Sequence, residues 1–383
     1  MTALSFAARP PTAPNRAPAG DGWVPAVAVV CGVVATLAFA LLSGGSFGQV
    51  TFVGAVAVAL GLCALRNPTF AVIALIATLF LRVPMASEID LPLQPWLLVF
   101  AVVVVAAVAW MHRTPTRLRG IGPIECAMAL YLLWNFYSMV TPHKYPAIDP
   151  LKGDPLPVPQ FIVIAVLIPF ASYAVGRYTF ERTQAVRALL WTMLAAAAYS
   201  AAVSIMPFVG LDEWVWPRYI ITEPAWDGRA VGIFNQPVVN GMVLVLGFAI
   251  AMVLASRRGE PRWRRCVAVV VIAACGVGIY LTYTRAVWLS AVVVLLLGAC
   301  LAKGSRGGFL AVIGVVMTMV TVNWSTFTSS DRESGGVASE SEINSRLNDI
   351  QTAWWARAEE PLQGWGIGRF PVVNTYHPVS YTH

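Results

Sequence analysis

Long apolar runs recur along most of this chain, and they limit its fold more than any other feature. A helix of about 20 apolar residues crosses the hydrocarbon core of a bilayer. Inside hydrocarbon every backbone N–H and C=O group must pair within the protein, which leaves helices or closed barrels. Barrel strands alternate in polarity, and these runs do not. The sequence therefore predicts an all-α, polytopic integral membrane protein.

Composition supports a membrane protein and argues against binding to nucleic acid. Of 383 residues, 58% are hydrophobic and 12% are charged, whereas soluble domains have about 25% charged residues. The net charge is +7, but the basic residues lie in short loops between apolar runs and form no single patch. The six cysteines lie in or beside apolar segments without a CxxC pair, which indicates small apolar residues rather than disulfides or a zinc site.

We expect about 11 transmembrane helices after a disordered cytoplasmic tail at 1–22, which is rich in Pro and Ala. Arg285 interrupts a run that is too long for one span, so we expect a tight hairpin there. The predicted segments together form a transmembrane domain at 23–323: 23–42, 50–65, 69–81, 93–111, 121–141, 158–176, 187–209, 237–256, 266–282, 286–301 and 308–323.

The distribution of Lys and Arg predicts the orientation. Alternate loops and the N-terminal tail together hold 16 of the 26 basic residues, and the positive-inside rule places that side in the cytoplasm. The N-terminus is then cytoplasmic, and the loops at 210–236, 283–285 and 324–383 face outward.

The long extracytoplasmic loop at 324–383 begins with a polar stretch and continues with a helix at about 342–358. Ser341 can cap this helix, and Ile343, Leu347, Ile350 and Trp354 share one face. We expect an amphipathic helix at the membrane surface that turns its Trp354 face towards the membrane domain.

The Gly-rich stretch QGWGIGRF follows this helix. No strand precedes it, so we interpret it as a flexible turn rather than a dinucleotide fingerprint. The chain stops at His383 with no final apolar run, so we expect the sequence given to be a truncated fragment.

Two arginines lie on the side that basic residues otherwise avoid. No charge lies in the middle of a predicted span, which argues against an ion-coupled transporter. Arg229 precedes the span at 237, and Arg285 lies at the hairpin tip. A guanidinium group is always charged and matches phosphate oxygens, so the pair suits a lipid-linked pyrophosphate. The alternative is snorkelling, or pairing with Glu223 or Asp227.

Three motifs occur in order: GRAVGIFNQP before a span, TYTRAVWL at the outer end of another, and SRLNDIQTAWWARAEEPLQGWGIGRF in the large outer loop. Together they resemble the O-antigen ligase and O-antigen polymerase family of bacterial envelope glycosyltransferases. The resemblance covers about 225–383. In that family the loop closes on a His-Asn pair, and here no Asn follows His383.

The resemblance implies a metal-independent enzyme of the bacterial cytoplasmic (inner) membrane that needs no cofactor. Its donor would be a glycan linked to undecaprenyl pyrophosphate, and its acceptor a glycan, a lipid or a protein on the outer face. Arg229 and Arg285 would bind the leaving pyrophosphate, and His383 would activate the acceptor hydroxyl as a base, with inversion at the anomeric carbon. Three further residues would bind substrate, with His377 also the alternative base: Arg346, Asn235 and His377.

There are three alternatives to a ligase. A non-catalytic membrane scaffold would not need two outward arginines and a loop that carries histidines. A capsule or exopolysaccharide polymerase would use the same donor, and the sequence does not separate it from a ligase. A polysaccharide or lipid transporter is disfavoured, because the chain has neither internal repeats nor a polar track through its spans. A lone loop histidine is also often just an exposed polar residue, which is the alternative for His377 and His383.

Overall fold

The structure is a computed structural model. It describes residues 68–88, 95–113, 122–148, 153–180, 183–224, 226, 228–257, 259–302, 304–322, 324, 340–361, 364–370 and 372–373. The predicted tail at 1–22 and the predicted segments at 23–42 and 50–65 lie outside this part of the chain, and so do His377 and His383.

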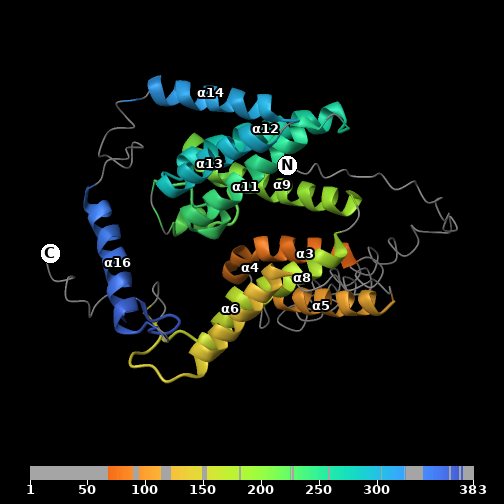
Figure 1. Ribbon diagram of the computed structural model, residues 1–383. Coiled ribbons are helices and arrows are strands. Elements are labelled where there is room, and N and C mark those ends of the chain that lie inside the picture. Colours follow the sequence, from red (N-terminus) through yellow and green to blue (C-terminus); the bar gives the residue numbers. More distant parts are fainter. Residues whose placement is uncertain are drawn as a thin grey trace, which may run out of the picture. The chain divides into compact units, whose positions relative to one another are not determined.

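The described chain is helical, and its one isolated β-bridge joins Ile148 to Pro155. The helices, of which Figure 1 labels all but α7 and α10, are α3 (Pro68–Phe80), α4 (Arg82–Glu88), α5 (Pro95–Arg113), α6 (Pro123–Val140), α7 (Val158–Ile162), α8 (Ile168–Thr179), α9 (Thr183–Ile205), α10 (Tyr219–Thr222), α11 (Pro237–Ser256), α12 (Arg262–Leu281), α13 (Arg285–Leu301), α14 (Arg306–Val322) and α16 (Glu340–Glu359). A π-helical turn, Val163–Leu167, joins α7 to α8, and short 3₁₀ turns lie at Met206–Val209, Asp212–Trp214 and Gly232–Phe234.

Four helices of the described chain are long and apolar enough to cross a membrane. They are Val158–Arg177, Thr183–Val209, Pro237–Ser256 and Arg262–Leu281. The other segments predicted within the described chain also form helices, namely α3, α5, α6, α13 and α14, but these are not in that set. The all-α fold is thus confirmed for the described residues, and the number of about 11 spans stays a prediction.

Helices α9, α11 and α12 pack side by side and form the core (Figure 1). Small residues allow this close approach, as is usual between membrane helices. A β-carbon added to Gly247 of α11 would lie 2.1 Å from the β-carbon of Ala197 on α9, and one on Gly278 of α12 would lie 2.9 Å from Leu244 of α11. The three helices are therefore in close contact both at the middle of α11 and near the end of α12.

The predicted hairpin is confirmed. Helix α12 ends at Leu281 and α13 begins at Arg285. Trp288 fixes the turn, because its Nε1 donates to the carbonyl oxygen of Ile279 at 3.0 Å and its ring stacks on Tyr280 with centroids 5.9 Å apart.

Helix ends and loops that the charge pattern assigns to one side contact one another. Arg187, near the start of α9, pairs with Glu260 of the loop before α12 at 3.6 Å on the basic side. On the other side, the backbone N–H of Ala230 donates to the carbonyl oxygen of Leu281, the last residue of α12, at 2.8 Å. These contacts agree with the predicted alternation, while the cytoplasmic assignment of the basic side stays a prediction.

The outer-loop helix exists as α16, but it packs differently from our expectation. It begins at Glu340, so Ser341 lies inside its first turn and is not the cap. Leu347 and Trp354 on the expected packing face are 50% and 65% exposed, whereas Thr352 and Ala356 are buried. The reason is that the following segment, 364–373, covers the opposite face through Trp365, whose Nε1 donates to the Ala356 carbonyl oxygen at 2.8 Å.

Candidate functional site

The two arginine-bearing segments meet at the same end of the α9–α11–α12 core. The loop before α11 carries Arg229, and the turn before α13 leads to Arg285. The hydrogen bond from the Ala230 N–H to the Leu281 carbonyl joins them. It holds the residue next to Arg229 against the last residue of α12, four positions before Arg285.

A buried polar network fixes the Arg229 loop to the core. Asn240, in the first turn of α11, is 0% exposed. Its Nδ2 donates to the Ala230 carbonyl oxygen and to Ser204 Oγ, each at 2.8 Å, and its Oδ1 accepts from Ser200 Oγ at 2.7 Å. Hydrogen bonds in such a low-dielectric site are strong and costly to lose. Both backbone polar groups of Ala230 are therefore held, the N–H by Leu281 and the C=O by Asn240.

The loop that follows Arg229 is compact because two of its residues adopt left-handed backbone geometry. Gly232 has φ +55°, and a β-carbon there would lie 2.2 Å from Asn240 Oδ1, so the position requires glycine. Asn235 has φ 48°, and its Nδ2 donates to the Glu223 carbonyl oxygen at 3.0 Å. The predicted substrate ligand Asn235 thus holds the loop in this structure, and its contact with substrate stays a prediction.

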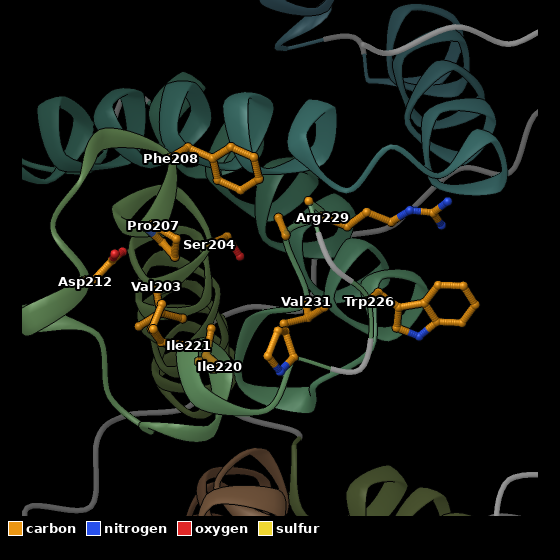
Figure 2. Close-up of a pocket in the computed structure, with 13 residues that line it drawn as sticks. Val203, Ser204, Pro207, Phe208, Asp212, Ile220, Ile221, Trp226, Arg229 and Val231 are labelled. Carbon is orange, nitrogen blue, oxygen red and sulfur yellow. The ribbon is translucent and has the colours of Figure 1, made fainter. Parts of the chain in front are cut away.

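Arg229 is half-buried and lies over an aromatic ring. Its guanidinium carbon is 5.2 Å from the ring centroid of Trp226, a favourable cation–π geometry. Figure 2 shows both side chains extending together, away from Asp212. Burial lowers the pKa of the Arg229 guanidinium from its ordinary value, but an arginine stays protonated at neutral pH. Among described residues it forms no ion pair; Asp227 lies outside them.

Arg285 is the first residue of α13, and the Nε and Nη2 atoms of its guanidinium are buried. Thr284 is the N-cap residue, but its side chain makes no capping hydrogen bond; its Oγ1 donates to the Thr282 carbonyl oxygen at 2.9 Å. The N-terminus of a helix carries a partial positive charge that favours anions. The Arg285 guanidinium and the N-terminus of α13 therefore both favour a bound anion.

A cavity of about 290 Å³ lies beside the Arg229 loop. Figure 2 shows its apolar wall, formed by side chains of α9, α10 and the turn between them. The lining is mostly apolar, with Ser204, Asp212 and Arg229 as its polar members: Val203, Ser204, Pro207, Phe208, Asp212, Ile220, Ile221, Pro224, Trp226, Gly228, Arg229, Ala230 and Val231. Such a site can accept an amphiphile whose anionic end lies near Arg229.

The other predicted site residues are not brought into this region by the described structure. Arg346 lies in α16, where its backbone alone is described, and His377 and His383 fall outside the described residues. Conversely, the sequence analysis missed Asn240, Ser200 and Ser204. Asn240 could have been found from the sequence, because it lies just inside an apolar span. A polar side chain at such a place usually has a partner.

Comparisons with models of known families, with curated proteins and with solved structures found no match to this chain. The resemblance to envelope glycosyltransferases therefore rests on the order and sidedness of its motifs.

Proposed function

We propose that this chain is a membrane glycosyltransferase that moves a glycan from undecaprenyl pyrophosphate to an acceptor. The hydrogen bond between Ala230 and Leu281 carries the proposal, because it joins the two motif segments that contribute Arg229 and Arg285. Segments some 50 residues apart in the chain thereby present two cations at one end of the core. A pyrophosphate leaving group needs such a concentration of positive charge.

The proposed reaction is a single displacement. The acceptor hydroxyl oxygen attacks the anomeric carbon, and the bond from that carbon to the pyrophosphate oxygen breaks. The electron pair of that bond leaves with undecaprenyl pyrophosphate, while a base, proposed to be His383, takes the hydroxyl proton. Arg229 and Arg285 neutralise the charge that develops on the leaving group. Fixed charges in a water-poor site commonly contribute several kcal/mol, roughly a hundred- to a thousand-fold in rate.

The arginine variants test the proposal. Arg229→Ala and Arg285→Ala should each lower transfer at least a hundred-fold while the protein remains in the membrane. Lysine at either position should restore transfer only in part. It keeps the positive charge but lacks the planar guanidinium that donates two parallel hydrogen bonds to a phosphate. Arg82→Ala is the matched control: this arginine is the first residue of α4, on the same predicted side, and its guanidinium lies over the Trp96 ring of α5, so the variant should transfer normally. Normal transfer by both Ala variants at positions 229 and 285 would exclude the phosphate-binding role.

The glycan profile of a deletion strain separates the two enzyme classes. Loss of all attached glycan indicates a ligase, whereas a ladder collapsed to one repeat unit indicates a polymerase. An unchanged profile rules out both.

A further inference from the structure

The glycine-rich segment Gly364–Arg369 docks on the loop between α6 and α7. The backbone N–H of Ile148 donates to the Gly368 carbonyl oxygen at 2.9 Å, and Arg369 Nε donates to the Tyr145 carbonyl oxygen at 2.7 Å. These bonds join parts of the chain more than 200 residues apart. In Figure 1 the end of α16 accordingly meets the loop that follows α6. The expectation of a flexible turn is therefore wrong.

The glycines are needed for this docking. Gly364, Gly366 and Gly368 all have φ between +63° and +87°, which other residues adopt only with strain. A β-carbon on Gly368 would lie 2.4 Å from Leu156 Cδ2, whereas one on Gly364 would meet nothing within 4 Å. The alternating glycines thus give the segment both its path and its close contact with the α6–α7 loop.

Three stacked rings complete the contact. Trp365 lies between Tyr145 of the loop and Trp355 of α16, with centroid distances of 5.6 and 5.7 Å. Helix α16, the segment Gly364–Phe370 and the described loop residues 141–148 and 153–157 consequently form one unit, here called the clasp. Leu156 of the clasp is two residues from Val158, where a candidate membrane span begins. The clasp therefore lies at the end of a membrane span.

The clasp leaves one apolar face of α16 exposed. Leu347, Ile350 and Trp354 are 50%, 53% and 65% exposed, and they lie on one side of the helix. The Arg357 guanidinium lies 5.7 Å from the Trp354 ring. Tryptophan beside a cation is typical of side chains at the boundary between lipid headgroups and acyl chains.

We propose that α16 docks this face on the surface of the phospholipid bilayer, and that the clasp holds it there. The occupant is lipid rather than protein, because the helix is tied within two residues of a membrane span and its opposite face is already covered. The inference requires a membrane-embedded chain but is independent of glycosyl transfer.

Site-directed nitroxides on the full chain test the docking. The protein, with its native cysteines replaced, is placed in nanodiscs of phosphatidylethanolamine and phosphatidylglycerol, and single cysteines at Leu347, Ile350 or Glu359 are labelled. Glu359 is the control, because it is exposed but lies about 120–180° around the helix from Leu347, Ile350 and Trp354. Labels at Leu347 and Ile350 should be several-fold more accessible to oxygen, which partitions into lipid, than to a water-soluble nickel complex. The label at Glu359 should show the reverse.

Two results would overturn the docking. If the nickel complex reaches Leu347 and Ile350 as readily as Glu359, the face is in water. If both positions are protected from both reagents, protein covers the face instead of lipid.

A matched glycine pair tests the clasp. Gly368→Ala and Gly364→Ala impose similar backbone strain, but Gly368→Ala alone collides with Leu156. With the label at Ile350, Gly368→Ala should raise access of the nickel complex several-fold, and Gly364→Ala should leave it near the parent value. Equal effects of the two substitutions would show that the contact with the α6–α7 loop does not hold α16.

Discussion

Removal of the Asn240 side chain should release the Arg229 loop from the core. Asn240→Ala deletes three side-chain hydrogen bonds at once, to Ser200, to Ser204 and to the Ala230 carbonyl oxygen. The matched control is Asn135→Ala. Asn135 is also buried in an apolar helix, but among the described residues its Nδ2 donates only to the Tyr131 carbonyl oxygen of its own helix. The two variants thus differ in whether the amide joins separate elements.

The expected loss of stability follows from the number of bonds. Side-chain hydrogen bonds between membrane helices average about 0.6 kcal/mol, which gives a lower value of about 2 kcal/mol for three. Buried bonds in general contribute about 0.5–1.5 kcal/mol each, which puts the upper value for three at about 4.5 kcal/mol. Asn135→Ala removes one bond within a helix and should therefore cost about 1 kcal/mol or less.

Two measurements check the prediction. The free energy of unfolding in mixed micelles should fall by the amounts above, and hydrogen exchange of the backbone N–H of Ala230 should accelerate in Asn240→Ala but not in Asn135→Ala. Glycan transfer should fall with the exchange protection, since a mobile loop no longer holds Arg229 in place. If Asn240→Ala loses no more stability than Asn135→Ala and exchange at Ala230 is unchanged, the network does not hold the loop.

Two further predictions concern packing and sidedness. Gly247→Ala should destabilise the core by about 1–3 kcal/mol, as overpacking does, because its β-carbon collides with Ala197. The control is Gly276→Ala in α12, where a β-carbon meets nothing within 4 Å; it should not destabilise, because alanine favours a helix interior over glycine by about 0.5–1 kcal/mol. Equal losses of unfolding free energy would contradict the close approach of α9 and α11. Single cysteines at Gly259 and Ser334 should react with an impermeant maleimide from opposite sides of the membrane, and labelling of both from one side would reject the orientation.

The sequence was sufficient to predict the parts of the fold that depend on local pattern. Apolar runs and Arg285 predicted α11, α12, α13 and the hairpin, and the spacing of Leu347, Ile350 and Trp354 predicted α16. Nothing local indicates that Ala230 bonds to Leu281 or that Asn240 joins two helices to a loop, since these contacts depend on how segments far apart in the chain pack. The candidate arginines were therefore predictable as residues, and their shared location was not.

The error about QGWGIGRF has a physical lesson of its own. Three glycines in six residues suit a flexible turn when only the cost of ordering them is considered. The same glycines are also the residues that accept positive φ and let another segment approach closely, and Gly368 does both against Leu156. The partner segment supplies the ordering energy through hydrogen bonds and the Tyr145–Trp365 stack. Glycine spacing alone does not distinguish these two outcomes, whereas the tryptophan between the glycines favours docking, because a large apolar ring gains from burial.

Two separate sets of contacts hold the Arg229 loop and helix α16. The proposed glycosyl transfer and the proposed membrane docking can therefore be tested independently. The Asn240 network ties the Arg229 loop to α9 and α11, while the clasp ties α16 to the α6–α7 loop, and the two sets of hydrogen bonds share no residue. Effects at sites without shared partners generally add. Asn240→Ala should thus lower transfer while the nitroxide at Ile350 stays in lipid. Gly368→Ala should move that nitroxide into water while the backbone N–H of Ala230 stays protected. If Gly368→Ala also abolishes transfer with Ala230 protected, the outer segment contributes to the reaction itself rather than through the Arg229 loop.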